Sequence, residues 1–211
     1  KHRGTFQGLM EKIPYMKELG INGIVLLPSY EFCEVATDRA EVRLDKNSGS
    51  ARTGQQITDQ KVNYWGYGTE ETFYFAPKAA YCSQQACPSA EFKEMVRSFH
   101  SNGIEVFLDI YFAPGTNIFL MTDCLRSWVL KYHIDGFRIN QEVMPLINVA
   151  SDPILSDVKV LAAYWDMDLL RNAGVPGQKN GMGEYNEGFM NDARRFLKGD
   201  EGMVERVAGY F

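Results

Sequence analysis

The stretch EFKEMVRSFHSNGIEVFLDI, Glu91 to Ile110, decides the fold because a helical pattern in it runs directly into a buried strand. Four apolar residues recur with the period of an α-helix: Phe92, Met95, Val96 and Phe99. Ser89 lies just before them and is a suitable N-cap, while Gly103 ends the pattern. We therefore predict a helix from Ser89 to Gly103 and a strand over 104–112.

The same helix-then-strand unit recurs three times along the chain. A helical pattern over 8–20, interrupted at Pro14, precedes an apolar run at 24–28. A helix over 121–132 precedes a strand at 134–139, and a further strand is expected at 158–165. Apolar strands that alternate with helices are typical of a parallel sheet covered on both faces. The fold class is therefore α/β, as either a doubly wound sheet or an eight-stranded barrel.

Composition excludes several classes of function. The chain has 211 residues, 45% of them hydrophobic, which suffices for one large core. A net charge of −5 without a clustered basic tract argues against nucleic-acid binding. The longest apolar stretch, 21–28, is far shorter than the roughly 20 residues of a membrane span. No cofactor or metal is expected, because four scattered cysteines, three histidines and the absence of phosphate-binding glycine motifs give no such signal.

A long loop, 29–88, separates the first strand from the second helix, far beyond the usual connection in an α/β unit. Its part over 45–60 is polar and glycine-containing, which predicts mobility. The segment NYWGYGTEETFYFAPKAAY, 63–81, instead concentrates aromatic residues. Trp65 and Tyr67 could stack against sugar rings, or could simply pack under the loop.

Four blocks of the sequence closely resemble the isoamylase-type debranching enzymes of the alpha-amylase superfamily, and most of all the non-catalytic isoamylase subunit of plants. They are GTFQGLMEKIPYMKELGINGIVLLPSYEF (4–32), NYWGYGTEETFYFAPKAAY (63–81), the stretch quoted first (91–110) and YHIDGFRI (132–139). The resemblance implies a (β/α)₈ TIM barrel with its site at the carboxyl ends of the strands. Such barrels typically have about 250 residues. Residues 1–211 are therefore expected to form only part of one, about strands 2 to 5 with their helices.

Three positions depart from the pattern that the resemblance implies. The nucleophile should end a strand of the form DGFRxD, but Asn140 stands there. The general acid should be the glutamate of a pattern like LIAEPWD, but VLAAYWD places Ala163 there. A third position, normally the histidine of FNH, is Pro114. Because a retaining glycosidase needs two carboxyl groups about 5 Å apart, these residues predict a protein that is not an enzyme.

Other residues keep the types that the resemblance implies for a glucan-binding groove. They are Trp65, Tyr67, Asp109, Arg138 and Trp165. Of these, Tyr67 is expected to stack on a glucosyl ring. Asp109, and likewise Asp135 nearby, could alternatively brace loops or neighbouring arginines.

The sequence thus predicts a catalytically inactive isoamylase-like subunit of the plastid stroma. Such a subunit would take part in starch debranching and amylopectin synthesis by binding rather than by catalysis. Its expected partners are branched α-glucan, amylopectin or glycogen, and a catalytic isoamylase subunit. One alternative is an active α-1,6-glucan hydrolase with displaced carboxylates, Glu142, Asp166 or Asp168. A glycan-binding domain without a catalytic partner is the other.

Overall fold

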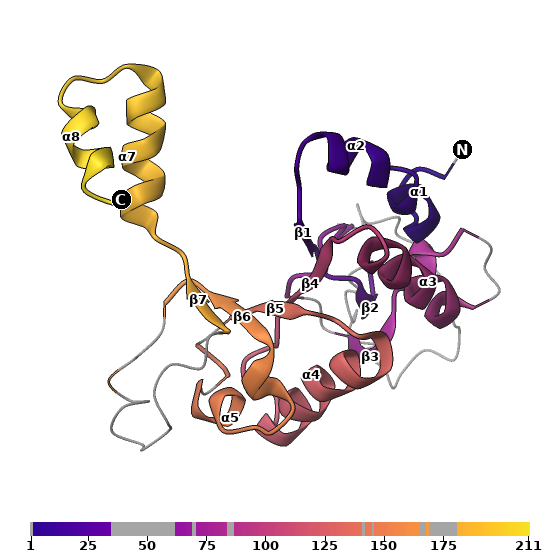
Figure 1. Ribbon diagram of the computed structural model, residues 1–211. Helices are drawn as coiled ribbons and strands as arrows, with labels where there is room; N and C mark the ends of the chain where they lie inside the picture. The colour runs from indigo at the N-terminus through magenta and orange to yellow at the C-terminus, as the bar shows by residue number, and fades with distance from the viewer. Residues whose placement is uncertain are drawn as a thin grey trace, which may run out of the picture.

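The computed structural model describes residues 2–34, 62–68, 71–83, 87–140, 142–144, 146–164, 168 and 181–211. Figure 1 shows its elements. The helices are α1 (Phe6–Met10), α2 (Ile13–Glu18), α3 (Pro88–His100), α4 (Ile118–Tyr132), α5 (Leu146–Ala150), α7 (Glu187–Lys198) and α8 (Met203–Ala208), with short 3₁₀ turns at Ala79–Tyr81 and Leu155–Asp157. The strands are β1 (Gly23–Leu26), β2 (Tyr30–Phe32), β3 (Thr72–Pro77), β4 (Glu105–Ile110), β5 (Gly136–Ile139), β6 (Lys159–Ala162) and β7 (Met182–Glu184).

The main sheet contains five parallel strands in the order β1-β4-β5-β6-β7. This arrangement confirms the predicted α/β class. Each strand pairs with the next main-sheet strand along the chain, as in a β/α barrel, whereas the strand order of a doubly wound sheet reverses at a switch point. The register pairs Asp109 with Arg138, so these two side chains leave adjacent strands at the same level.

The first predicted unit is found with small shifts at its ends. Helix α3 begins at Pro88, and its N-cap is Cys87 rather than Ser89. Proline suits the first helical position because its φ is already helical and it has no N–H to satisfy. The hydroxyl of Ser89 instead lies 3.0 Å from the Tyr132 hydroxyl of α4. The four apolar residues of the predicted helix are all buried.

Pro14 divides the predicted 8–20 helix into α1 and α2. Proline stands in the first turn of α2, where its missing N–H costs nothing. The Thr5 hydroxyl caps α1 by accepting a hydrogen bond from the Gly8 N–H at 3.0 Å. Two short helices therefore replace one long helix, because the chain restarts at the proline.

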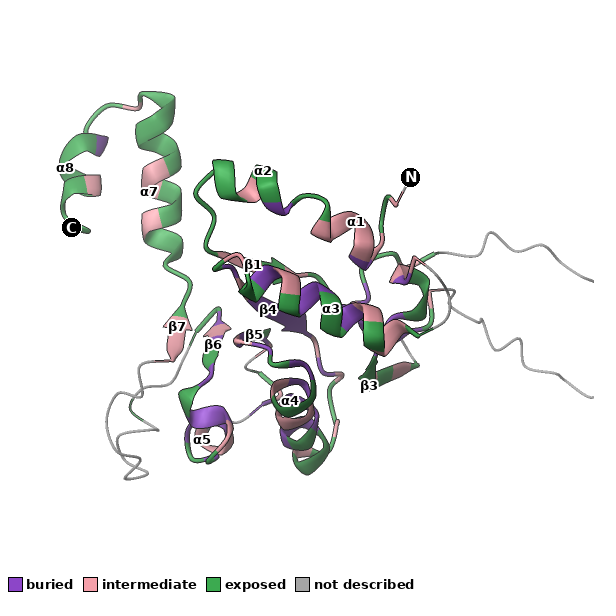
Figure 2. Cartoon of the chain, turned by 45° about the vertical axis from the view of Figure 1, so that its right-hand side comes forward, coloured by how far each residue is buried: buried purple, intermediate pink, exposed green. Residues whose placement is uncertain are grey.

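The core lies between the main sheet and helices α3 and α4. Phe92, Trp128 and Tyr132 form a cluster of rings with centroids 4.7 to 5.3 Å apart. In Figure 2 the buried residues of these helices face the strands. Gly136 allows β4 and β5 to approach closely, because a Cβ there would lie 2.4 Å from the Phe107 ring.

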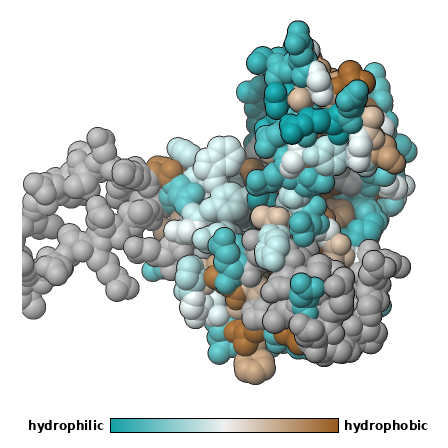
Figure 3. Space-filling model, turned by 90° about the vertical axis from the view of Figure 1, so that its left-hand side faces the viewer, coloured by the Kyte–Doolittle hydropathy of each residue, from teal (hydrophilic) through white to brown (hydrophobic). Residues whose placement is uncertain are grey.

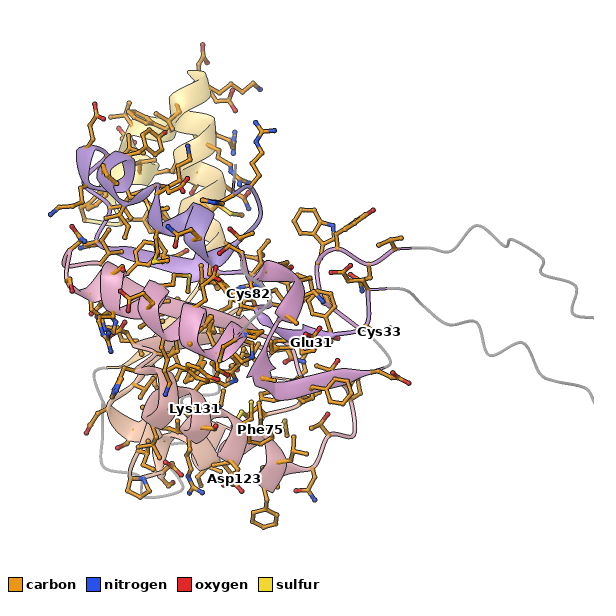
Figure 4. All side chains as sticks on the ribbon, turned by 90° about the vertical axis from the view of Figure 1, so that its right-hand side faces the viewer. Glu31, Cys33, Phe75, Cys82, Asp123 and Lys131 are labelled. Atoms are coloured by element: carbon orange, nitrogen blue, oxygen red, sulfur yellow. The ribbon has the colours of Figure 1, made fainter. Side chains whose placement is uncertain are left out.

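Strands β2 and β3 form a separate antiparallel pair between β1 and α3. The pair is fixed to α4, whose Trp128 Nε1–H donates to the Tyr74 carbonyl at 2.8 Å. Figure 4 shows Phe75 of β3 and Asp123 of α4 on neighbouring elements. The predicted loop 29–88 therefore includes paired strands, while its stretch 45–60 lies outside the described residues.

Helices α7 and α8 pack against each other and stand apart from the sheet beyond β7 (Figure 1). Helix α7 is capped by the Asn186 side chain, which accepts from the Phe189 N–H, and it ends before Gly199. The face of the molecule in Figure 3 is largely hydrophilic over its described part, with hydrophobic side chains in small groups. Within the described ranges, no helix has the length and apolar character needed to cross a membrane.

Candidate functional site

A pocket of about 520 Å³ lies at the carboxyl ends of β4, β5 and β6. Parallel strands bring their carboxyl ends to one edge of the sheet, and in a β/α barrel that edge carries the active site. The pocket is lined by Tyr67, Asp109, Tyr111, Arg138, Ile139, Asn140, Glu142 and Ala163. Five of these positions were singled out from the resemblance: Tyr67, Asp109, Arg138, Asn140 and Ala163.

An ion pair between Asp109 and Arg138 forms the floor of the pocket. Asp109 is only 4% exposed, so its charge requires compensation, which Arg138 on the next strand supplies. The Tyr67 hydroxyl donates to the same carboxylate oxygen at 2.5 Å. Burial and then the bond to Asp109 raise the pKa of Tyr67, so its hydroxyl remains a donor at neutral pH. The bond to Asp109 also raises the pKa of Arg138.

Asn63 fixes the loop that carries Tyr67. Its Oδ1 accepts hydrogen bonds from the backbone N–H groups of Trp65 at 3.0 Å and Gly66 at 3.1 Å. Its Nδ2 donates to the Tyr67 carbonyl at 2.7 Å. Gly66 has a φ of +74°, and a Cβ there would lie 2.6 Å from the Phe32 ring. These hydrogen bonds and the close approach at Gly66 hold the loop in the conformation that places Tyr67 at the pocket.

Trp65, predicted to bind substrate, lies on the same loop but is 62% exposed and does not line the pocket. Trp165 lies outside the described residues. Asp135 does not line the pocket either. Its carboxylate accepts from the Val106 N–H at 2.7 Å and lies 2.7 Å from His100 Nε2, so it braces β4 and α3.

The side chain of Asn140 forms two hydrogen bonds with the backbone of Phe112. Its Oδ1 accepts from the Phe112 N–H at 3.0 Å, and its Nδ2 donates to the Phe112 carbonyl at 2.9 Å. The last ladder pair of β4 and β5 is Ile110 with Ile139, so the amide extends the pairing beyond it. An amide can supply both a donor and an acceptor, whereas an ionised carboxylate only accepts.

The other two positions that depart from the family pattern, Ala163 and Pro114, do not lie together. Ala163 lines the pocket beyond the end of β6, whereas Pro114 is exposed in the turn that leads to α4 and is not part of the lining. Of the three alternative carboxylates, Glu142 lines the pocket and is exposed. Asp168 does not line it, and Asp166 lies outside the described residues.

Tyr185, just beyond β7, contacts a residue of the pocket and was not singled out from the sequence. The guanidinium carbon of Arg138 lies 5.7 Å from the centroid of its ring. The short strand MGE has neither an apolar run nor alternation, so nothing in the local pattern predicted a sheet position for β7.

A larger hollow, of about 740 Å³, lies between α1 and β1. Leu27 and Val25 line it beside residues 2–12, and none of the residues predicted for the site contributes to it. Size alone would favour this hollow as the functional site, but the active site of a β/α barrel lies at the carboxyl ends of its strands. Among the described residues, no group of three or more His, Cys, Asp or Glu side chains is arranged to hold a metal ion.

Comparison with known proteins gives a consistent set of relatives. No known family profile matches the chain. Isoamylase 3, chloroplastic, from Oryza sativa subsp. japonica is 31% identical, with 98% of this chain and 33% of that protein covered. Isoamylase SU1, chloroplastic, from Zea mays is 28% identical, with 99% and 34% covered. A glycogen operon protein GlgX homolog from Haemophilus influenzae is 28% identical, with 98% and 38% covered.

The chain spans about a third of the length of these relatives. Among solved structures, a pullulanase from Anoxybacillus sp. LM18-11 complexed with maltotriose gives a TM-score of 0.65 at 18% identity, covering 100% of this chain and 38% of that one. The Group B Streptococcus pullulanase SAP gives 0.64 at 18% identity, covering 91% and 30%. The predicted alpha-amylase-type barrel, present in part, is confirmed.

The comparisons also correct one prediction. From Asn140, Ala163 and Pro114 the sequence analysis predicted a protein that is not an enzyme. The relatives and structural neighbours are instead enzymes by name, isoamylases and pullulanases. The prediction rested on three motif positions in a chain that spans only about a third of these relatives.

Proposed function

We propose that this chain forms the glucan-binding part of an α-1,6-glucan hydrolase. Over nearly its whole length it is a homologue of the isoamylase-type debranching enzymes. The observation that carries this proposal is the pocket at the carboxyl ends of β4, β5 and β6, where Tyr67, Asp109 and Arg138 are linked by hydrogen bonds. Its substrate would be a branched α-glucan such as amylopectin or glycogen.

The pocket has the composition that a sugar ring requires. Its volume of about 520 Å³ lies within the usual range for small-molecule sites. Tyr67 and Tyr111 contribute rings with centroids 6.0 Å apart, and the apolar face of a pyranose stacks on such surfaces. Asp109 and Arg138 supply hydrogen-bonding groups for the hydroxyls on the rim of the sugar.

Two carboxylates of the described residues line the pocket, and their surroundings suit different roles. Asp109 is buried and bound by Arg138 and Tyr67, so it would position the sugar by accepting a hydrogen bond from one of its hydroxyls. Glu142 is exposed at the pocket and would transfer the proton to the leaving oxygen. This assignment corresponds to an active hydrolase with a displaced carboxylate.

Release of reducing ends from amylopectin by the full-length protein tests the proposal. We expect measurable release, and we expect Glu142→Gln to lower kcat by roughly 10²-fold or more, the usual contribution of a general acid. Glu18→Gln, on the exposed end of α2, is the matched control and should leave the rate unchanged. No release by the unaltered protein, or equal rates for the two variants, would contradict the proposed role.

We further propose that the protein acts in the plastid stroma, in starch debranching and amylopectin synthesis, in association with a catalytic isoamylase subunit. The names of the plant relatives, which are chloroplastic isoamylases, support the compartment. Imaging of a fluorescent fusion in leaf cells tests the location. Co-purification of an isoamylase with the tagged protein tests the partner. Recovery of the tagged protein alone would argue against an isoamylase partner.

A further inference from the structure

Tyr185 follows β7 directly and lies beside Arg138, a residue that lines the pocket. Its backbone N–H donates to the Ala162 carbonyl at 3.1 Å, which continues the pairing of β6 with β7. Ala163, which lines the pocket, follows that carbonyl directly. The Tyr185 ring is therefore carried by the rigid sheet and lies near the pocket, while 45% of the residue remains exposed.

A line of contacts connects Tyr185 to the floor of the pocket. The Arg138 guanidinium lies over the Tyr185 ring at 5.7 Å, within the range of a cation–π interaction. Arg138 forms the ion pair with Asp109, and Asp109 accepts the hydrogen bond from Tyr67. Two tyrosine rings, one from the loop between β2 and β3 and one just beyond β7, thus contact the same ion pair.

We propose that Tyr185 is a second stacking platform for α-glucan, next to the glucosyl unit that Tyr67 and Asp109 contact. This inference rests on the proposed function. A tyrosine ring offers a large apolar surface with few rotatable bonds, which suits it to bind the apolar face of a pyranose. Arg138 holds the ring and can donate to sugar hydroxyls with its remaining N–H groups. The ligand is an uncharged glucan chain rather than an anion, because the Arg138 charge is already neutralised by Asp109.

Affinity electrophoresis of the full-length protein in gels that contain amylopectin tests this platform. Tyr185→Ala should bind about fivefold to tenfold more weakly, the change expected from one lost ring contact. Tyr185→Phe keeps the ring and should retain the original affinity. Tyr15→Ala, which removes a 58% exposed tyrosine from α2, is the matched control and should be unchanged.

The outcomes separate the inference from the proposed function. If the unaltered protein is not retarded by amylopectin, both are wrong. If it is retarded and Tyr185→Ala is retarded equally, only the platform is wrong. If Tyr185→Phe loses as much affinity as Tyr185→Ala while its melting temperature is unchanged, the hydroxyl rather than the ring binds, and stacking is refuted.

Discussion

Replacing Asn140 by Asp exchanges the side-chain NH2 group for an oxygen and should destabilise the protein at neutral pH. The Asn140 amide donates to the Phe112 carbonyl at 2.9 Å and accepts from the Phe112 N–H at 3.0 Å. The carboxylate keeps the accepted bond but loses the donated one, and it places an oxygen against the Phe112 carbonyl. Leaving a buried acceptor without its donor costs about 1–3 kcal/mol. We therefore expect a loss of about 2 kcal/mol in the free energy of unfolding, the middle of this range.

Urea unfolding of the full-length protein, followed by tryptophan fluorescence, measures this loss. Asn148→Asp introduces the same charge on α5, away from the pocket, and should change the free energy of unfolding by less than about 0.5 kcal/mol. Hydrogen exchange gives a second readout, because the Phe112 N–H should stay protected in Asn140→Asp and lose protection in Asn140→Ala. Equal stability of Asn140→Asp and the unaltered protein would show that the two hydrogen bonds between Asn140 and Phe112 do not stabilise the fold.

Three further predictions concern stability. Because the pKa of Tyr67 is raised in the folded protein, the unfolded chain releases this phenol proton at a lower pH, and the free energy of unfolding falls above about pH 10. In urea titrations, the free energy of unfolding of Tyr67→Phe should fall less between pH 9 and 11 than that of the unaltered protein. Burial opposes ionisation of Glu91, but hydrogen bonds from Cys82 and Ser83 outweigh it and lower its pKa. The resulting stabilisation is lost in acid, and Glu91→Gln should lower the melting temperature at pH 7 more than at pH 3. Gly136→Ala should cost about 1–3 kcal/mol by calorimetry, because its Cβ would overlap a phenyl ring.

The helix–strand units could be predicted because their apolar residues recur with clear periods. Phe92 and Phe99 mark the buried face of α3, and the run at 104–112 contains all of β4. Ends were less predictable, since Pro88 rather than Ser89 begins α3. Strand β7 has three residues without an apolar pattern, so only the pairing with β6 defines it.

The candidate site was predictable where a residue's place follows from the end of a strand. Asp109, Arg138 and Asn140 lie at or just beyond such ends, and the structure brings them into one pocket. Trp65 was grouped with Tyr67 because both keep the residue types that the resemblance implies for a glucan-binding groove. The turn fixed by Asn63 nevertheless delivers only Tyr67 to the pocket, and hydrogen bonds of this kind leave no periodic signal.

Titration of maltohexaose into the full-length protein by calorimetry tests most directly the central claim that α-glucan binds at the carboxyl ends of β4, β5 and β6. Tyr67→Ala removes a pocket ring, and Tyr64→Ala removes a 69% exposed ring of the same loop that does not line the pocket. We predict binding to the unaltered protein, about tenfold weaker binding to Tyr67→Ala, and unchanged binding to Tyr64→Ala. Equal affinities for all three proteins, or no heat of binding to any of them, would contradict the claim.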